Sequence, residues 1–123
     1  MIGYVCIGTN DLALAARFYD ELLSVLGAKR VWGDNERYIA WGTTEDGPAL
    51  TLIKPYDGKP AAVGNGNMVA LAASSTAQVD ALYNKAIALG GKDEGPAGRR
   101  SDSFYAGFFR DLEGNKLSVF YSG

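Results

Sequence analysis

Residues 3–27 decide the fold of this chain, and they read GYVCIGTNDLALAARFYDELLSVLG. The apolar run at residues 3–8 predicts a short strand, and Thr9, Asn10 and Asp11 supply side-chain oxygens that begin helices. Apolar residues then recur at three- and four-residue spacing, as in an amphipathic helix. They are Leu12, Ala15, Ala16, Tyr19, Leu22, Leu23 and Leu26. Gly27 stands where a helix C-cap belongs, so the stretch predicts a strand followed by a helix.

The same pattern recurs in the second half of the chain. Strand-like runs at residues 29–32, 37–41 and 49–54 follow the first helix, and a connector rich in proline and glycine covers residues 57–66. An apolar run at 68–73 then precedes a second helical stripe, for which Ser75 and Gln78 predict a capping box. Residues 92–103 form a polar, glycine-rich segment, and residues 104–110 and 116–121 predict the last two strands.

Residues 3–8 correspond to residues 67–72, so the chain reads as one unit repeated. We predict an α+β fold in a single domain spanning residues 1–123, built from two βαβββ modules at 1–56 and 67–123. Together the modules are expected to form a curved mixed sheet with helices on the outer face. Repeats this short cannot each bury an apolar face alone, so they must pack together.

Strand side chains alternate between the two faces of a sheet. One phase is apolar and is expected under the helices; it holds Val5, Ile7, Leu50, Leu52, Val69, Leu71, Leu117 and Val119. The opposite phase is expected on a concave face; it holds Tyr4, Cys6, Thr51, Ile53, Met68, Ala70, Ser118 and Phe120. That second face must be covered by a ligand, by a partner protein or by its own side chains packed as core.

The composition excludes several classes of function. Twelve basic and 14 acidic residues give a net charge of −2, whereas nucleic-acid-binding surfaces are strongly basic. No apolar run approaches the ~20 residues that cross a bilayer, and no signal peptide is visible. The single cysteine, Cys6, cannot form an internal disulfide, which fits a reducing compartment. We therefore expect a cytoplasmic protein without nucleic-acid or membrane partners.

The chain contains no histidine, which excludes Ser-His-Asp and Cys-His catalysis and histidine-bound metals or haem. With one cysteine, a cysteine-rich zinc or iron–sulfur site is excluded as well. Any metal would need a shell of oxygen ligands, which favours hard ions. The sequence predicts no cofactor.

Three motifs, in this order and spacing, resemble the glyoxalase/bleomycin-resistance/dioxygenase superfamily, also called the vicinal oxygen chelate superfamily. Asn10-Asp11-Leu12 with Phe18-Tyr19-Asp20 is similar to the opening of its first module. Residues 64–71 (GNGNMVAL) are similar to the start of its second module, and residues 108–116 (FFRDLEGNK) to its final hairpin. The resemblance covers essentially the whole chain and implies the two-module fold.

The resemblance also implies a site. Enzymes of the superfamily hold a divalent metal between the modules with His, Glu or Gln on four strands. The corresponding positions here are Tyr4, Thr51, Met68 and Ser118. A thioether and neutral hydroxyls do not hold Zn, Ni or Fe(II), so we expect no metal and a metal-free pocket in its place.

The resulting hypothesis is a metal-independent protein that binds a small apolar or aromatic molecule and forms a homodimer, as superfamily members commonly do. We expect the ligand to contact Tyr4, Trp41, Thr51, Met68, Tyr105 and Ser118. The sequence identifies no catalytic residue. The alternatives are a lyase, isomerase or dioxygenase with a non-standard or metal-free site, and an interaction module with a filled pocket.

Two further features have two interpretations each. Arg99-Arg100 could clamp a ligand carboxylate, but a solvated loop is the favoured interpretation. Cys6 could be a nucleophile, but the chain has no histidine to activate it. The favoured interpretation is that Cys6 is a small apolar residue buried in the core.

Overall fold

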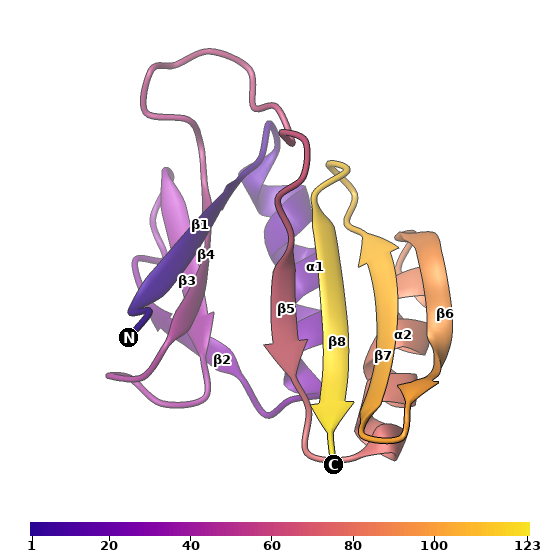
Figure 1. Ribbon diagram of the computed structural model, residues 1–123. Coiled ribbons are helices and arrows are strands. Elements are labelled where there is room, and N and C mark those ends of the chain that lie inside the picture. Colours follow the sequence, from indigo (N-terminus) through magenta and orange to yellow (C-terminus); the bar gives the residue numbers. More distant parts are fainter. The chain divides into compact units, whose positions relative to one another are not determined.

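The computed structural model describes all of residues 1–123, which divide into two compact units, Met1–Val63 (unit 1) and Gly64–Gly123 (unit 2). Each unit holds one helix and one four-stranded sheet (Figure 1). Unit 1 contains β1 (Tyr4–Gly8), α1 (Leu12–Ser24), β2 (Lys29–Trp32), β3 (Tyr38–Gly42) and β4 (Ala49–Ile53). Unit 2 contains β5 (Val69–Ala72), α2 (Thr76–Ala88), β6 (Lys92–Ser101), β7 (Phe104–Arg110) and β8 (Lys116–Ser122). The predicted α+β fold of two βαβββ modules is confirmed.

The two sheets have the same topology. The strand order is β1-β4-β3-β2 in unit 1 and β5-β8-β7-β6 in unit 2. In each sheet the first strand pairs in parallel with the last, and the other pairs are antiparallel. In each unit the chain runs from the first strand through the helix and two further strands before it reaches the parallel partner of the first strand. Parallel partners need such a long crossover connection, which usually contains a helix.

The helices begin at the predicted caps. The Asp11 carboxylate accepts from the Leu14 amide at 3.1 Å, and the Ser75 hydroxyl accepts from the Gln78 amide at 3.1 Å. The capping box differs in one bond, because the Gln78 side chain accepts from the Ser74 amide at 2.7 Å instead of that of Ser75. Gly27 follows α1 with a φ of +75°, a conformation that glycine adopts without a Cβ clash.

One strand of the second βαβββ module was not located from the sequence. It is β6 at the edge of the sheet in unit 2, and its residues 92–101 belong to the polar, glycine-rich segment. The pairing of β6 with β7 shifts register in three places, between Asp93 and Gly95, between Gly95 and Gly98, and between Arg99 and Ser101. Each irregularity interrupts the two-residue period, so no alternating pattern is left in the sequence.

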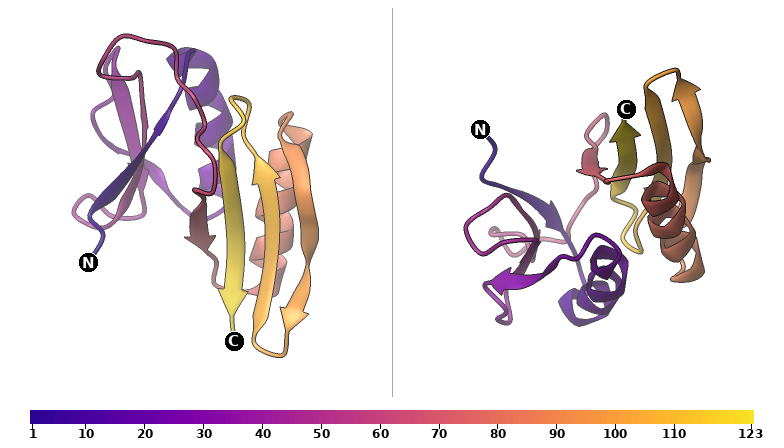
Figure 2. Two further views of the ribbon diagram at one scale, coloured as in Figure 1. Left: turned by 45° about the horizontal axis from the view of Figure 1, so that its top comes forward. Right: turned by 90° about the horizontal axis from the view of Figure 1, so that it is seen from below.

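The predicted division of the strands into two faces is confirmed by the register. In unit 2, β8 brings Leu117 and Val119 under α2, where both are fully buried with Val79 and Leu82. Figure 2 shows α2 lying along one face of this sheet, with no helix of unit 2 on the other. We call the uncovered side of each sheet its open face. Neither helix is long and apolar enough to cross a membrane.

Candidate functional site

The open face of unit 1 carries three aromatic side chains in series. Cross-strand register places Cys6, Thr51 and Ala40 side by side, with Trp32 opposite Ala40 on the next strand. The Tyr4 and Trp32 rings meet edge to face with centroids 5.3 Å apart, and Trp32 meets the Tyr38 ring at 6.2 Å. Tyr4 is 60% exposed, so this aromatic row offers accessible ring surface.

A buried hydroxyl group lies on this same face. Thr51 is 1% exposed, and its Oγ1 has no hydrogen-bond partner. Buried polar atoms in folded proteins are almost always paired, because an unpaired hydroxyl costs about 1–3 kcal/mol. The Thr51 hydroxyl is therefore a buried polar group on this face whose hydrogen-bonding capacity the protein leaves unused.

Cys6 is also on this face, next to Thr51 in register. The side chain is exposed, which corrects the expectation of a buried apolar role. That expectation failed because β1 is an edge strand whose open side no helix covers. Partial desolvation raises the pKa of the Cys6 thiol, so the thiol stays protonated near neutral pH and is a weak nucleophile.

The open face of unit 2 is apolar and aromatic as well. Phe108 pairs with Ser118 in register, and the Phe104 and Phe120 rings stack with centroids 5.7 Å apart. Met68 directly precedes β5 and is 43% exposed, whereas Ser118 is buried. Of the six residues expected to bind a ligand, the structure thus places Tyr4 and Thr51 on one open face, and Ser118 on the other.

Trp41 and Tyr105 lie elsewhere, on the helix-covered faces. Trp41 pairs with Leu50 in register and is 2% exposed, and its indole Nε1 donates to the Asp20 carboxylate of α1 at 2.9 Å. The Tyr105 hydroxyl donates to the Asp80 carboxylate of α2 at 2.6 Å. Both side chains hold a helix against its sheet, and neither shares a face with the other expected ligand contacts.

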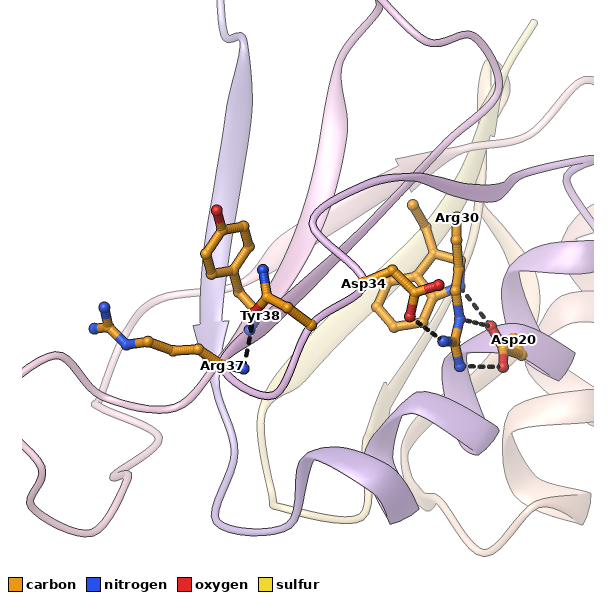
Figure 3. Close-up of polar contacts among 7 residues, drawn as sticks. Asp20, Arg30, Asp34, Arg37 and Tyr38 are labelled. Atoms are coloured by element: carbon orange, nitrogen blue, oxygen red, sulfur yellow. Dashed lines mark hydrogen bonds and ion pairs between the residues drawn. The ribbon is translucent and has the colours of Figure 1, made fainter.

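A polar network ties α1 to β2 behind this core (Figure 3). Arg30 binds both carboxylate oxygens of Asp20 at 2.8 and 2.9 Å and also binds Asp34 at 2.6 Å. Its guanidinium lies 5.8 Å from the centroid of the Trp41 ring. The Arg30 hydrogen bond, followed by that from Trp41, lowers the pKa of Asp20 despite partial desolvation. The network is structural, because it satisfies the buried indole N–H.

Replacing Asp20 by alanine is expected to lower the free energy of unfolding by about 2 kcal/mol, because the buried Trp41 N–H loses its acceptor. Asp34→Asn is the matched control, because it removes only the charge of an exposed ion pair and keeps a residue type that tolerates the left-handed backbone at position 34, where φ is +46°. It should cost less than about 0.5 kcal/mol. Since the folded-state pKa of Asp20 is depressed, its contribution is present above about pH 4 and is lost as the pH falls further. Urea unfolding at pH 7 and pH 3 measures both effects; equal losses for the two variants would contradict the network's role.

A hollow of about 620 Å³ lies on the helix side of unit 1, near the start of α1. It is lined by residues that include Leu12, Arg17, Asn35 and Lys54. Its charges are mixed, because the acidic Asp11 and Glu36 line it together with three cations, Arg17, Arg30 and Lys54. It shares no residue with either open face.

The residues present do not fit the metal that the superfamily's enzymes use. The four corresponding positions carry a phenol (Tyr4), two aliphatic hydroxyls (Thr51 and Ser118) and a thioether (Met68). No group of three or more His, Cys, Asp or Glu side chains in the structure could hold a metal ion.

Comparison with known proteins places this architecture in a family. The family model of the glyoxalase/bleomycin resistance protein/dioxygenase superfamily matches residues 1–119. A glyoxalase/bleomycin resistance protein from Albidiferax ferrireducens is 34% identical, with a TM-score of 0.89 over 100% of this chain and 99% of that one. The chain therefore belongs to the glyoxalase/bleomycin resistance protein/dioxygenase superfamily.

More distant solved structures share the fold. A glyoxalase/bleomycin resistance protein/dioxygenase family enzyme from Burkholderia phytofirmans is 17% identical, with a TM-score of 0.74 over 96% of this chain and 95% of that one. Lactoylglutathione lyase from Agrobacterium tumefaciens is 24% identical, with a TM-score of 0.69 over 98% of this chain and 92% of that one. Among curated proteins, none is significantly similar in sequence to this chain.

Proposed function

We propose that this protein is a cytoplasmic, metal-independent binding protein for small aromatic molecules that carry a polar group. The observation that carries the proposal is the unpartnered Thr51 hydroxyl, which lies on the same open face as the Tyr4, Trp32 and Tyr38 rings. Rings supply contact for a flat apolar molecule, and the hydroxyl supplies one directional hydrogen bond. The donor set at the superfamily's metal positions supports binding without a metal.

Thr51→Val tests the proposal, because it keeps the shape of the side chain and removes only the hydroxyl. Since that hydroxyl has no partner, the free energy of unfolding should stay within about 0.5 kcal/mol of the parent or rise. The affinity for 2-naphthalenemethanol, measured by calorimetry, should fall about fivefold or more.

Thr9→Val is the matched control. Thr9 is also 1% exposed, but its Oγ1 accepts from the Asp11 amide at 3.1 Å. Loss of this bond should lower the free energy of unfolding by about 1–2 kcal/mol and leave the affinity for the probe unchanged. Equal binding by the parent and Thr51→Val would overturn the assignment of the hydroxyl to the ligand.

Cys6 provides an independent reporter, because it is the one cysteine and lies beside Thr51. We expect iodoacetamide to alkylate Cys6 slowly at pH 7 and faster as the pH rises, since the pKa of the thiol is raised. Saturating 2-naphthalenemethanol should slow alkylation at least fivefold by covering the face. The rate is followed by mass spectrometry, and a rate unaffected by the probe would argue against a ligand on this face.

We also propose that the protein forms a homodimer. Outside the proposed ligand contacts, Ile2, Tyr56 and Leu112 are 59%, 89% and 41% exposed, and a partner chain could cover such apolar surface. Sedimentation velocity at micromolar concentration should give the mass of two chains. A monomer at all accessible concentrations would contradict this part of the proposal.

A further inference from the structure

We infer that the open face of unit 2 binds a planar aromatic molecule that carries an anionic group, with Arg100 and Lys116 holding the anion. The inference rests on the proposed function, since it specifies the charge of the aromatic ligand. It concerns unit 2 alone and does not depend on the Thr51 hydroxyl of unit 1.

Two cations converge on one ring of this face. The Arg100 guanidinium lies 5.6 Å and the Lys116 ammonium 5.8 Å from the centroid of the Phe108 ring. Phe108 faces outward, because it pairs with Ser118, in the phase opposite to the buried Leu117 and Val119. The charges therefore lie on the open face, next to the row of aromatic side chains.

Neither of these two charges forms an ion pair within the protein, although Glu94 lies near enough to Lys116 to interact with it electrostatically. Arg110 and Glu94 form an ion pair at 2.6 Å and neutralise each other. Arg100 donates to the backbone carbonyls of Pro96 at 2.7 Å and Gly98 at 2.9 Å, and no carboxylate lies within ion-pair distance of Arg100 or Lys116. The face thus carries an excess of positive charge, although the chain as a whole is negative. An anion bound here would neutralise the two cations and accept charge-assisted hydrogen bonds from them.

A glycine makes this arrangement possible. Gly95 pairs with Phe108 in register, and a Cβ at Gly95 would lie 3.2 Å from Phe108 Cδ2 and 3.4 Å from Arg100 Nη2. Without that Cβ, the guanidinium settles over the ring and is held there by its two carbonyl bonds. The cation is therefore fixed before a ligand arrives, which reduces the entropy that binding costs.

Apolar ring surface adjoins the charges. Phe104 and Phe120 stack at an interplanar angle of 28°, and Phe120 is two residues along β8 from Ser118, the register partner of Phe108. A ligand ring against Phe120 would place an attached carboxylate toward Phe108 and its two cations. The neighbouring Arg99 does not contribute, because its guanidinium lies over Tyr105 on the helix-covered face.

The test compares three probes of one shape and different charge: 2-naphthoate, 2-naphthalenemethanol and 2-naphthylmethylammonium, titrated into the full chain by calorimetry at low salt. We expect 2-naphthoate to bind at least tenfold more tightly than the alcohol, and the ammonium probe to bind most weakly. Lys116→Gln and Arg100→Gln should each weaken 2-naphthoate binding about fivefold and leave alcohol binding unchanged. Arg99→Gln is the matched control and should bind all three probes like the parent.

Lys116→Gln keeps the test decisive if Arg100→Gln fails to fold, because Lys116 makes no hydrogen bond through its side chain in the structure. Equal affinity for all three probes, or an Arg99→Gln loss as large as that of Lys116→Gln, would overturn the charge assignment while the proposed function stands. Failure of every probe to bind would overturn both. Backbone amide shifts in β7 and β8 on titration with 2-naphthoate would support the assignment to this face.

Discussion

Phe109→Ala should lower the free energy of unfolding by about 3–5 kcal/mol, the range for removing a large aromatic ring from a packed core. Phe109 is fully buried under α2, and it pairs with the equally buried Leu117. A truncation there leaves a cavity that the rigid helix–sheet interface cannot close. The change is measured by urea unfolding followed by circular dichroism.

Phe108→Ala is the matched control, one residue away on the opposite face of β7. Its ring is half-buried and contacts Arg100 and Lys116, so its removal should cost only about 1 kcal/mol. The pair tests the division into a helix-covered and an open face on which both proposals rest. Comparable losses for the two variants would mean that the open face is core.

The second large effect is expected at the turn between β7 and β8. Asp111 is 5% exposed, and its Oδ1 accepts from the amides of Glu113, Gly114 and Asn115 at 2.8–3.0 Å. Its Oδ2 accepts from the Asn115 side chain at 3.1 Å. Asp111→Ala leaves several donors unpaired and should cost about 3 kcal/mol.

Asp111→Asn separates the two sets of bonds. The amide oxygen can still accept from the three backbone N–H groups, whereas the amide nitrogen cannot accept from Asn115. We expect a loss of about 1 kcal/mol, measured by the same unfolding assay. A loss in Asp111→Asn as large as in Asp111→Ala would show that the backbone bonds contribute little.

Local signals in the sequence were sufficient for most of the fold. Cap residues and apolar spacing placed both helices, and the repeated pattern placed seven strands to within one or two residues. β6 was missed because its bulges and its polar, edge-strand sequence remove the alternation on which prediction depends. The alternation of β1, β4, β5 and β8 also predicted which side chains face away from the helices.

The site was less predictable, because it depends on pairing between strands. Whether Trp41 points toward α1 or away from it depends on its register with Leu50, which the intervening turn determines. The same holds for Tyr105 and its partner Tyr121. Trp32 and Phe108 were recognisable as aromatic strand residues, but their neighbours Tyr4 and Arg100 come from other strands. The spacing of residues along the sequence does not predict contacts between side chains on different strands.

The three register shifts of β6 have a consequence for behaviour at high concentration. An outer strand with regularly spaced free amides and carbonyls can recruit a strand from another molecule and seed fibrils. Along β6 those groups are unevenly spaced, and lysine, aspartate and glutamate occupy its first three positions. Extension of the sheet past this edge is therefore disfavoured. The aromatic open face of unit 2 can stay exposed without an adjoining edge strand that would template aggregation.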